Sequence, residues 1–340
     1  MRIVDERPPA IQEEVNPVLA AMTAGRDFLL THQRPSGLWM DFRMGPGWSD
    51  EWVTGYVGDR LSLVPGTRLA RERAWKKLKE RSQVRPVGWG YNVLVPQCAD
   101  TTTWVLRLAR SVGGLDEPEA RAALASLHDF RRPDGLMTTF AEAEPIRRFM
   151  RANPDRDYSG WTGSHVCVTA ATAGLAGIVD HQHLLDHQLS NGHWHGYWWE
   201  SDTFVTALAT ETLADEPAQL RAADWAESML HSQTEWSAFD LANLLAVCTI
   251  AGRVDSNAAL IARDRLLATA RDDGSWEPGA VMRVPNPDDV TPDESSAWIP
   301  DGLVPGSLIR DSRRIFTTAT VVWALLRWAA GHDWLPVRAK

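Results

Sequence analysis

The chain has 340 residues, 44% of them hydrophobic, and a formal net charge of −9 at pH 7. It is long enough to bury a large core, and its negative charge argues against a nucleic-acid partner, because nucleic-acid binding needs a basic surface. No apolar run approaches the roughly 18 residues of a membrane span, and the charged start MRIVDERPPA lacks the apolar centre of a signal peptide, so we expect a cytoplasmic protein.

Tryptophan is over-represented, with 17 copies against 8 Phe and 4 Tyr. In chain order, a first pattern of an apolar helical stretch followed by Gln33, Gly37 and Trp39 appears in FLLTHQRPSGLW (28–39) and returns in LLDHQLSNGHW (184–194). Partial copies stand at KERSQVRPVGWG (79–90, with Gln83), LHDFRRPDGL (127–136), LHSQTEW (230–236) and LLATARDDGSW (266–276). Glycine permits a tight turn after a helix and the tryptophan can cover that turn, so we predict a structural role for these tryptophans.

A second pattern follows each of these turns and opens an apolar, Ala-rich segment of helical length. Its copies are DEWVT (50–54), DTTTW (100–104), HVCVT (165–169), DTFVT (202–206), DLANL (240–244) and FTTAT (316–320). Small residues suit helices that are packed closely on most sides. The chain thus repeats an outer helix, a turn and an inner helix six times, which predicts an all-α fold, a single (α/α)6 barrel. An open superhelix of hairpins is the main alternative.

This repeat predicts an N-terminal tail at 1–16 and one barrel at 17–336. All the inner-helix starts then lie at one end of the barrel. Two long irregular loops, at about 137–163 and 277–314, lie at the same end. Long loops in a compact domain are usually functional or disordered, so this end is the expected active-site mouth.

The Gln-Gly-Trp repeats resemble the QW repeats of the squalene-hopene and oxidosqualene cyclases. GWGYNVLVPQCADTTTW (88–104) is similar to the segment in which class II terpene cyclases carry the acidic motif D-x-D-D-T-A. The resemblance places Asp100 on the central aspartate, the proton donor of the family, with Cys98 and Thr101 in place of the flanking aspartates. It implies a terpenoid cyclase toroid, although family members usually have two stacked barrels and this chain has length for one.

A lone aspartate changes the chemistry that we expect. Paired carboxylates raise one another's pKa, and Asp100 lacks such partners in sequence, although burial among apolar side chains could still keep it protonated. The alternative is that Asp100 is a helix cap, because Asp50, Asp202 and Asp240 hold the same position in other pentads.

His165 and Asp202 are the other candidate catalytic residues. His165 takes the helix-start position and could act as a base or as a partner of the acid, and a histidine satisfied at a helix start is the alternative. Asp202 follows Trp198, Trp199 and Glu200 in GYWWESDTFVT, where indole faces could stabilise a carbocation and the carboxylate could steer or deprotonate it. A capped turn with packed indoles explains the same segment.

Candidate substrate-binding residues are mostly aromatic or polar and lie near the inner-helix starts. They are Asp50, Trp52, Trp89, Tyr91, Thr101, Trp104, Trp161, Cys167, Trp198, Trp199, Glu200, Asp240, Arg314 and Phe316. Arg314, with Arg313, could hold a diphosphate or carboxylate, or could be a solvated surface charge.

We expect no metal and no cofactor. Cys98, Cys167 and Cys248 are far apart and form no zinc-type pair, and the His-rich segment at 180–195 lacks a clear ligand set. The absence of a D-D-x-x-D pattern argues against magnesium-assisted ionisation of a diphosphate. The expected partners are a small isoprenoid substrate and a second copy or other subunit that closes the barrel mouth.

The leading functional hypothesis is a terpenoid cyclase of class II type, which protonates an alkene or epoxide and cyclises the chain through carbocations. One alternative is a single-barrel enzyme of other chemistry, either prenyltransferase-like or a glycan-processing enzyme that uses Glu200 and Asp240. Another is a non-catalytic barrel that binds a hydrophobic ligand. An apolar cavity with one acid favours the cyclase, and a polar cavity with two acids favours the glycan enzyme.

Overall fold

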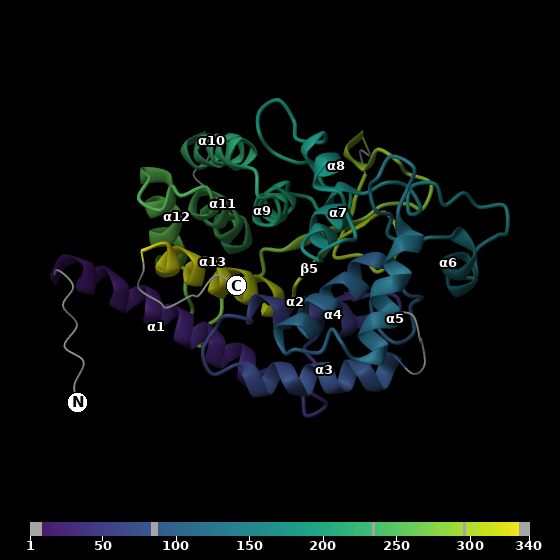
Figure 1. Cartoon of the computed structure of the whole chain (residues 1–340), viewed down its shortest axis with the longest axis horizontal. Helices are drawn as coiled ribbons and strands as arrows, with labels where there is room; N and C mark the ends of the chain where they lie inside the picture. The colour runs from purple at the N-terminus through teal and green to yellow at the C-terminus, as the bar shows by residue number, and fades with distance from the viewer. Residues whose placement is uncertain (1–8, 83–87, 233–234, 295–296, 333–340) are drawn as a thin grey trace.

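The computed structural model describes residues 9–82, 88–232, 235–294 and 297–332. Within them, an outer ring of helices surrounds an inner ring (Figure 1). The inner helices are α2 (Glu51–Arg60), α4 (Ala99–Ser111), α7 (Val166–Ala173), α9 (Thr203–Thr212), α11 (Ala238–Ile250) and α13 (Ile315–Gly331). The outer helices are α1 (Pro9–Thr31), α3 (Arg68–Ser82), α5 (Pro118–Ser126), α8 (His181–Leu185), α10 (Glu216–Ser232) and α12 (Asn257–Ala268).

The inner ring is closed. Contacts run from α2 to α4, continue through α7, α9 and α11 to α13, and return from α13 to α2. The inner helices are buried over most of their length and rich in alanine and threonine, which lets neighbouring helix axes pack closely. The predicted all-α toroid is confirmed, and the open superhelix is excluded. None of the described helices combines the length and the apolar character that a membrane crossing requires.

Four of the predicted structural tryptophans have the same role. The indole N–H of Trp39 donates to the carbonyl of Leu29 at 2.7 Å, near the C-terminal end of the preceding outer helix. The indoles of Trp89, Trp194 and Trp276 donate in the same way at 2.7 to 2.8 Å. Leu29, Leu184 and Leu266 lie among the last four residues of their helices, so the rings of Trp39, Trp194 and Trp276 satisfy carbonyls that the end of a helix leaves free.

The glutamines of the two complete repeats connect each turn to the next outer helix. Gln33 Nε2 donates to the carbonyl of Gly37 and to that of Ala70 in α3, both at 2.8 Å. Gln188 does the same with the carbonyls of Gly192 and Ala218, the second of which lies in α10. Gln83 and residues 233–234 of the partial copies lie outside the described residues.

A second set of hydrogen bonds connects five of the turns to the inner helix that follows. The donors are the backbone N–H groups of Trp39, Trp89, Met137, Trp194 and Trp276, and the acceptors are the hydroxyls of Thr54, Thr102, Thr169, Thr206 and Thr318. Each threonine stands four residues after the N-cap of its helix; the N-caps are Asp50, Cys98, His165, Asp202 and Arg314. The alignment of Asp100 with Asp50 and Asp202 is therefore wrong by two residues, because Cys98 holds the cap position of α4.

The loops at the inner-helix N-termini contain short elements that the sequence pattern did not indicate. They are β1 (Asp41–Met44), β2 (Gly47–Ser49), η1 (Leu127–Phe130), α6 (Ala143–Met150), β3 (Val281–Val284), η2 (Pro292–Glu294), β4 (Ile299–Pro300) and β5 (Ser307–Arg310). β1 and β2 form an antiparallel hairpin, and β5 pairs antiparallel with β3 and parallel with β4. The long segments at 137–163 and 277–314 thus hold α6 and the three-stranded sheet. Helix α1 begins at Pro9, inside the segment expected as a tail, and the division into a tail and one barrel stays a prediction.

The C-terminal ends of the inner helices carry a buried cluster of charges. Glu211 Oε2 lies 3.0 Å from Arg60 and 3.2 Å from Arg107, and its other oxygen lies 2.6 Å from Arg327. Arg107 also pairs with Asp59 at 3.1 Å. This network, which we call the basal ion cluster (Asp59, Arg60, Arg107, Glu211 and Arg327), fills the end of the ring opposite the mouth.

The Gly-Trp turns can be tested with an alanine at Gly192. Its φ is +101°, and an added Cβ would lie 2.1 Å from the backbone oxygen of Arg221. Gly192→Ala should lower the free energy of unfolding by more than the roughly 1 to 2 kcal/mol that a left-handed conformation alone costs. Chemical denaturation measures this, with Gly252→Ala as the control, because Gly252 has φ +77° and nothing within 4 Å of an added Cβ. Equal losses in the two variants would contradict a close approach of turn and helix.

Candidate active site

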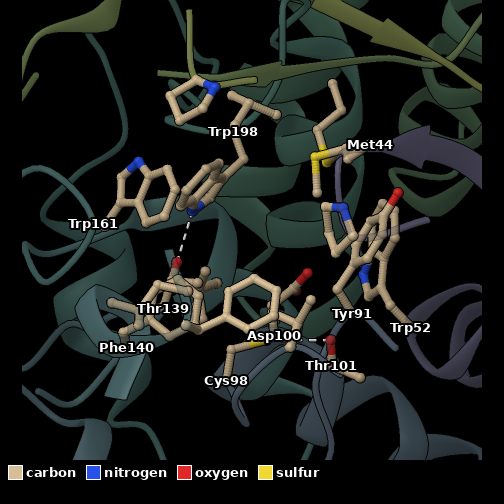
Figure 2. A pocket seen from close by; sticks show the side chains of 18 of the residues that line it. Met44, Trp52, Tyr91, Cys98, Asp100, Thr101, Thr139, Phe140, Trp161 and Trp198 are labelled. Atoms are coloured by element: carbon tan, nitrogen blue, oxygen red, sulfur yellow. Dashed lines mark hydrogen bonds between the residues drawn. The ribbon is translucent and has the colours of Figure 1, made fainter. Parts of the chain in front are cut away.

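A cavity opens at the N-terminal end of the inner ring, beneath the mouth loops. It holds about 1020 Å³ of empty space, including its opening to solvent. The indoles of Trp161 and Trp198 lie on one side of the cavity, and the rings of Trp52 and Tyr91 lie on the other. Asp100 lies between the two sides (Figure 2). Among its lining residues, Asp100 is the one with an ionisable carboxyl, and none is a lysine, arginine or histidine.

The floor of this cavity and the layer packed directly behind it come from one position in each inner helix, two residues after the N-cap. The six residues at this position are Trp52, Asp100, Cys167, Phe204, Phe239 and Phe316. The rings of Phe239 and Phe316 lie 5.9 Å apart between centroids, and those of Trp52 and Phe316 lie 5.1 Å apart. Asp100 is therefore the single acid in a ring of otherwise apolar and aromatic side chains.

The Asp100 carboxyl is poorly solvated. Its side chain is half-buried because it faces the cavity, and the walls of the cavity are apolar. Burial raises the pKa of this carboxyl to about 7, against the smaller opposite effect of the indole N–H groups of Trp104 and Trp52. Trp104 Nε1 donates to Asp100 Oδ1 at 3.1 Å, whereas Trp52 Nε1 is close but makes no hydrogen bond of good geometry with the described residues. No ion pair reaches Asp100 within the described chain, so a large part of it is protonated at neutral pH.

Asp100 is not the cap of α4. It is the second residue of the helix, and its hydrogen-bond partner is the indole of Trp104 rather than a backbone N–H. The positive end of a helix favours a carboxylate, yet the loss of solvation outweighs that effect here.

The three other aspartates are placed differently, outside the cavity lining. Arg81 holds both oxygens of Asp50, at 2.7 and 2.9 Å. Asp240 accepts from the hydroxyls of Ser237 and Thr203, each at 2.6 Å.

Asp202 accepts from the N–H of Gly196 at 3.0 Å and pairs with His193 and His195. Although burial raises its pKa, the hydrogen bonds from His193 and His195 hold it well below its usual range. The structure therefore gives the Asp202 carboxylate fixed partners and no access to the cavity, contrary to the position that the catalytic hypothesis requires.

His165 is the N-cap of α7 and lies behind the cavity wall. The backbone N–H of Thr139 donates to His165 Nδ1 at 3.2 Å, and Nε2 lies 2.8 Å from the carbonyl of Gly160. Burial lowers the pKa of this imidazole to about 4, so His165 is neutral at physiological pH. A backbone N–H can only donate, so Nδ1 is the acceptor and Nε2 carries the proton.

The structure brings together about half of the candidate site residues at the cavity. Those that line it are Trp52, Tyr91, Asp100, Thr101, Trp161, Cys167, Trp198 and Trp199. Trp104 and Phe316 pack directly behind this lining, through the hydrogen bond to Asp100 and the aromatic contacts with Trp52.

The remaining candidates lie elsewhere. Trp89 belongs to a Gly-Trp turn, and Glu200 is exposed to solvent. Arg314 is the N-cap of α13 and pairs with Asp273 at 2.9 Å, so it does not face the substrate cavity.

Several lining residues carried no sequence signal of their own. Thr139, Phe140, Ile146, Phe149 and Met150 come from the first long loop and α6; Met282, Val284, Leu303, Val304 and Pro305 come from the second. The unusual length of these two loops was the one feature that pointed to them. Among the described residues, no group of three or more His, Cys, Asp or Glu side chains is arranged to hold a metal ion.

A closed double ring of helices with one acid at the floor of an apolar, aromatic cavity defines a terpenoid cyclase toroid. No family model and no curated protein matches the chain. Among solved structures, a variant of the type II terpene cyclase MstE from Scytonema, in complex with geranylgeranyl dihydroxybenzoate as substrate, is 33% identical with a TM-score of 0.87, over 94% of this chain and 99% of that one. A protein from Actinoplanes is 34% identical with a TM-score of 0.82, over 92% and 99%.

The chain belongs to the type II terpene cyclases. It is an acid-initiated enzyme that cyclises an isoprenoid substrate through carbocations. An ent-copalyl diphosphate synthase from Streptomyces platensis shares the fold alone, with 18% identity and a TM-score of 0.53, over 83% of this chain and 50% of that one.

The raised pKa of Asp100 has a consequence for stability. A folded-state pKa of about 7 lies above the ordinary 3.8, so this carboxyl contributes nothing unfavourable below pH 3.8 and destabilises the fold progressively as pH rises through 7. Asp100→Asn should therefore unfold much like the wild type at pH 4 and be more stable at pH 8, by up to about 4 kcal/mol. Denaturant titrations at the two pH values measure the difference. A stability gap that stays the same at both would contradict the raised pKa.

Proposed function

We propose that Asp100 is the proton donor and that the substrate is a linear prenyl chain attached to an aromatic head group. The observation that carries this proposal is a single carboxyl, its pKa raised by burial, at the floor of an aromatic cavity. A carboxyl with a pKa near the working pH combines a large protonated fraction with the ability to give up its proton. Asp100 then protonates a terminal alkene or epoxide.

The position of the acid sets the orientation of the substrate. Asp100 lies at the floor and the opening lies among the mouth loops, so the far end of the chain reaches the floor while the head group stays near the mouth. The faces of Trp52, Trp198 and Trp199 line the space between, where their negative potential stabilises the cations that form after protonation.

The lining also bears on the head group. It contains no lysine or arginine, so a diphosphate would find no cationic partner inside the cavity. MstE, the related cyclase, has geranylgeranyl dihydroxybenzoate as its substrate and merosterolic acid A as its product. An uncharged prenyl chain inside the cavity with an aromatic group outside it fits both observations.

The cavity separates this function from the alternatives drawn from the sequence. It is apolar with one acid, whereas a glycan-processing barrel needs two, and neither Glu200 nor Asp240 lines it. Asp202 does not line the cavity either, so it has no role in the proposed mechanism. The closer relationship to squalene-hopene cyclases through QW repeats, a second subunit at the mouth and a cytoplasmic location stay predictions.

The proposal is tested with Asp100→Asn. The purified enzyme is incubated with geranylgeranyl dihydroxybenzoate, linear terpenoid alcohols and their terminal epoxides, and cyclised products are measured by mass spectrometry. Loss of the donor should lower turnover by at least about 100-fold, the scale on which general acids contribute. The matched control is Asp272→Asn, because Asp272 is an exposed surface carboxylate. Turnover by Asp100→Asn at the wild-type rate would rule out Asp100 as the donor, whereas a wild type that converts none of these compounds would favour a binding barrel.

The pH dependence of the wild type provides a second test. The donor must be protonated, so kcat should be highest below the pKa of about 7 and fall tenfold per pH unit well above it. In D2O, each cyclised product should also carry one deuterium at the carbon that receives the proton. A rate that stays constant between pH 6 and 9 would contradict the assignment.

A further inference from the structure

The side chain of Thr139 connects the cavity to His165 through hydrogen bonds. Thr139 lines the cavity, and Trp198 Nε1 donates to Thr139 Oγ1 at 2.7 Å, as the dashed line in Figure 2 shows. On its other side, Thr139 Oγ1 lies 2.8 Å from His165 Nδ1. The carbonyl of Thr139 accepts from the N–H of Ala99 at 3.0 Å, so the hydroxyl stands on a segment next to that of Asp100.

The direction of each hydrogen bond follows from groups that can only donate. The backbone N–H of Thr139 donates to His165 Nδ1, which makes this nitrogen an acceptor. The Thr139 hydroxyl must therefore donate its own proton to the same nitrogen. The Trp198 indole occupies one lone pair of Oγ1, and no described residue occupies the second. The hydroxyl is thus oriented with its proton on the imidazole and with one lone pair left for the cavity.

The surroundings of His165 keep its acceptor nitrogen available. The ring stacks on Tyr197 with centroids 4.2 Å apart and meets Trp198 edge-on at 5.7 Å. Arg132 is the charged group that acts on it, and no carboxylate pairs with it in the described chain. Burial and Arg132 both favour the neutral imidazole, with its second proton directed to the carbonyl of Gly160.

We infer that Thr139 and His165 together form the proton acceptor that ends the cyclisation. This inference rests on the proposed function. The carbon next to the final cationic centre loses its proton to Thr139 Oγ1, and the electrons of that C–H bond form the alkene. At the same time, the original proton of the hydroxyl passes to His165 Nδ1, so Thr139 remains neutral and the imidazole becomes an imidazolium. The substrate gains one proton from Asp100 and loses one to this pair, so the reaction is an isomerisation.

A weak base is sufficient for this step. A carbocation is a very strong acid at the neighbouring carbon, so even a neutral imidazole of low basicity takes the proton favourably. The same low basicity lets His165 return the proton through Thr139 once the product has left and water enters the cavity. Two other polar groups at the cavity are engaged as donors: the Tyr91 hydroxyl donates to the carbonyl of Phe42, and the Cys98 thiol donates to Thr101.

The test separates termination from initiation with three variants and geranylgeranyl dihydroxybenzoate as the probe. Thr139→Val removes the hydroxyl and keeps the shape, Thr139→Ser keeps the hydroxyl, and His165→Gln keeps an acceptor and a donor but cannot take up a proton. Substrate consumption and the proportions of all products are measured together. In Thr139→Val and His165→Gln, consumption should fall less than tenfold, because Asp100 still starts the reaction. The wild-type alkene should fall at least tenfold relative to alcohols formed by water capture and to other alkene isomers.

Thr139→Ser should restore the wild-type product proportions. A merely structural role would lower all products in the same ratio, and that result would overturn the inference, as would an unchanged product mixture in Thr139→Val. A wild-type product that is exclusively an alcohol would overturn it as well. Failure of the proposed function looks different, because Asp100→Asn would then remain active or the wild type would not convert the probe.

Discussion

Five hydrogen bonds, each from a turn to a threonine hydroxyl, set the register of five of the six inner helices. Each bond fixes how far its inner helix extends toward the mouth, since the threonine stands four residues after the N-cap in α2, α4, α7, α9 and α13. The residue two positions after each cap then arrives at the same level. The floor of the cavity follows from this common register, and Asp100 becomes its acid because α4 places an aspartate where α2 places Trp52 and α9 places Phe204.

The basal ion cluster lies at the end of the ring opposite the cavity, and this separation favours the protonated form of Asp100. Every arginine of the basal ion cluster lies at the C-terminal ends of the inner helices, where Glu211 and Asp59 bind them. A guanidinium within contact of Asp100 would favour its ionised form. Trp104 stands between the two regions: its indole N–H donates to Asp100, while Arg107 lies 4.6 Å from the centre of its ring. The Trp104 indole thus contacts both Asp100 and Arg107 and keeps the guanidinium away from the carboxyl.

Much of the fold could be predicted from the sequence because the six repeats are separate copies of one pattern. The roles of turn residues such as Gly192 and Trp194 depend on residues close to them in sequence, so a local pattern is enough to predict them. The register of the inner helices could not be predicted so well. The pentads were aligned on their aspartates, whereas the hydrogen bonds from the turns are accepted by threonines. Thr54 and Thr206 end their pentads, but Thr102 is in the middle of its own, which displaced Asp100 by two residues.

The site was predictable where a residue type has an intrinsic role, as for Asp100 and the indoles of Trp52 and Trp198. It was not predictable where tertiary contacts assign the role. Thr139 is an ordinary polar residue in a loop, and only the fold brings it between Trp198 and His165. Asp202 shows the converse, since its neighbours in sequence suggest a site while His193 and His195 bind it outside the cavity.

The floor has a consequence for how such an enzyme can diversify. The positions two residues after the six N-caps are equivalent along the backbone. The place at which a substrate is first protonated therefore depends on which repeat carries the acid. An acid at position 167 of α7 in place of the acid at position 100 of α4 would move the site of protonation around the ring axis while the helices stay in place. In such a barrel, the repeated helices shape the cavity that confines the cation, and a single side chain decides where the cation forms.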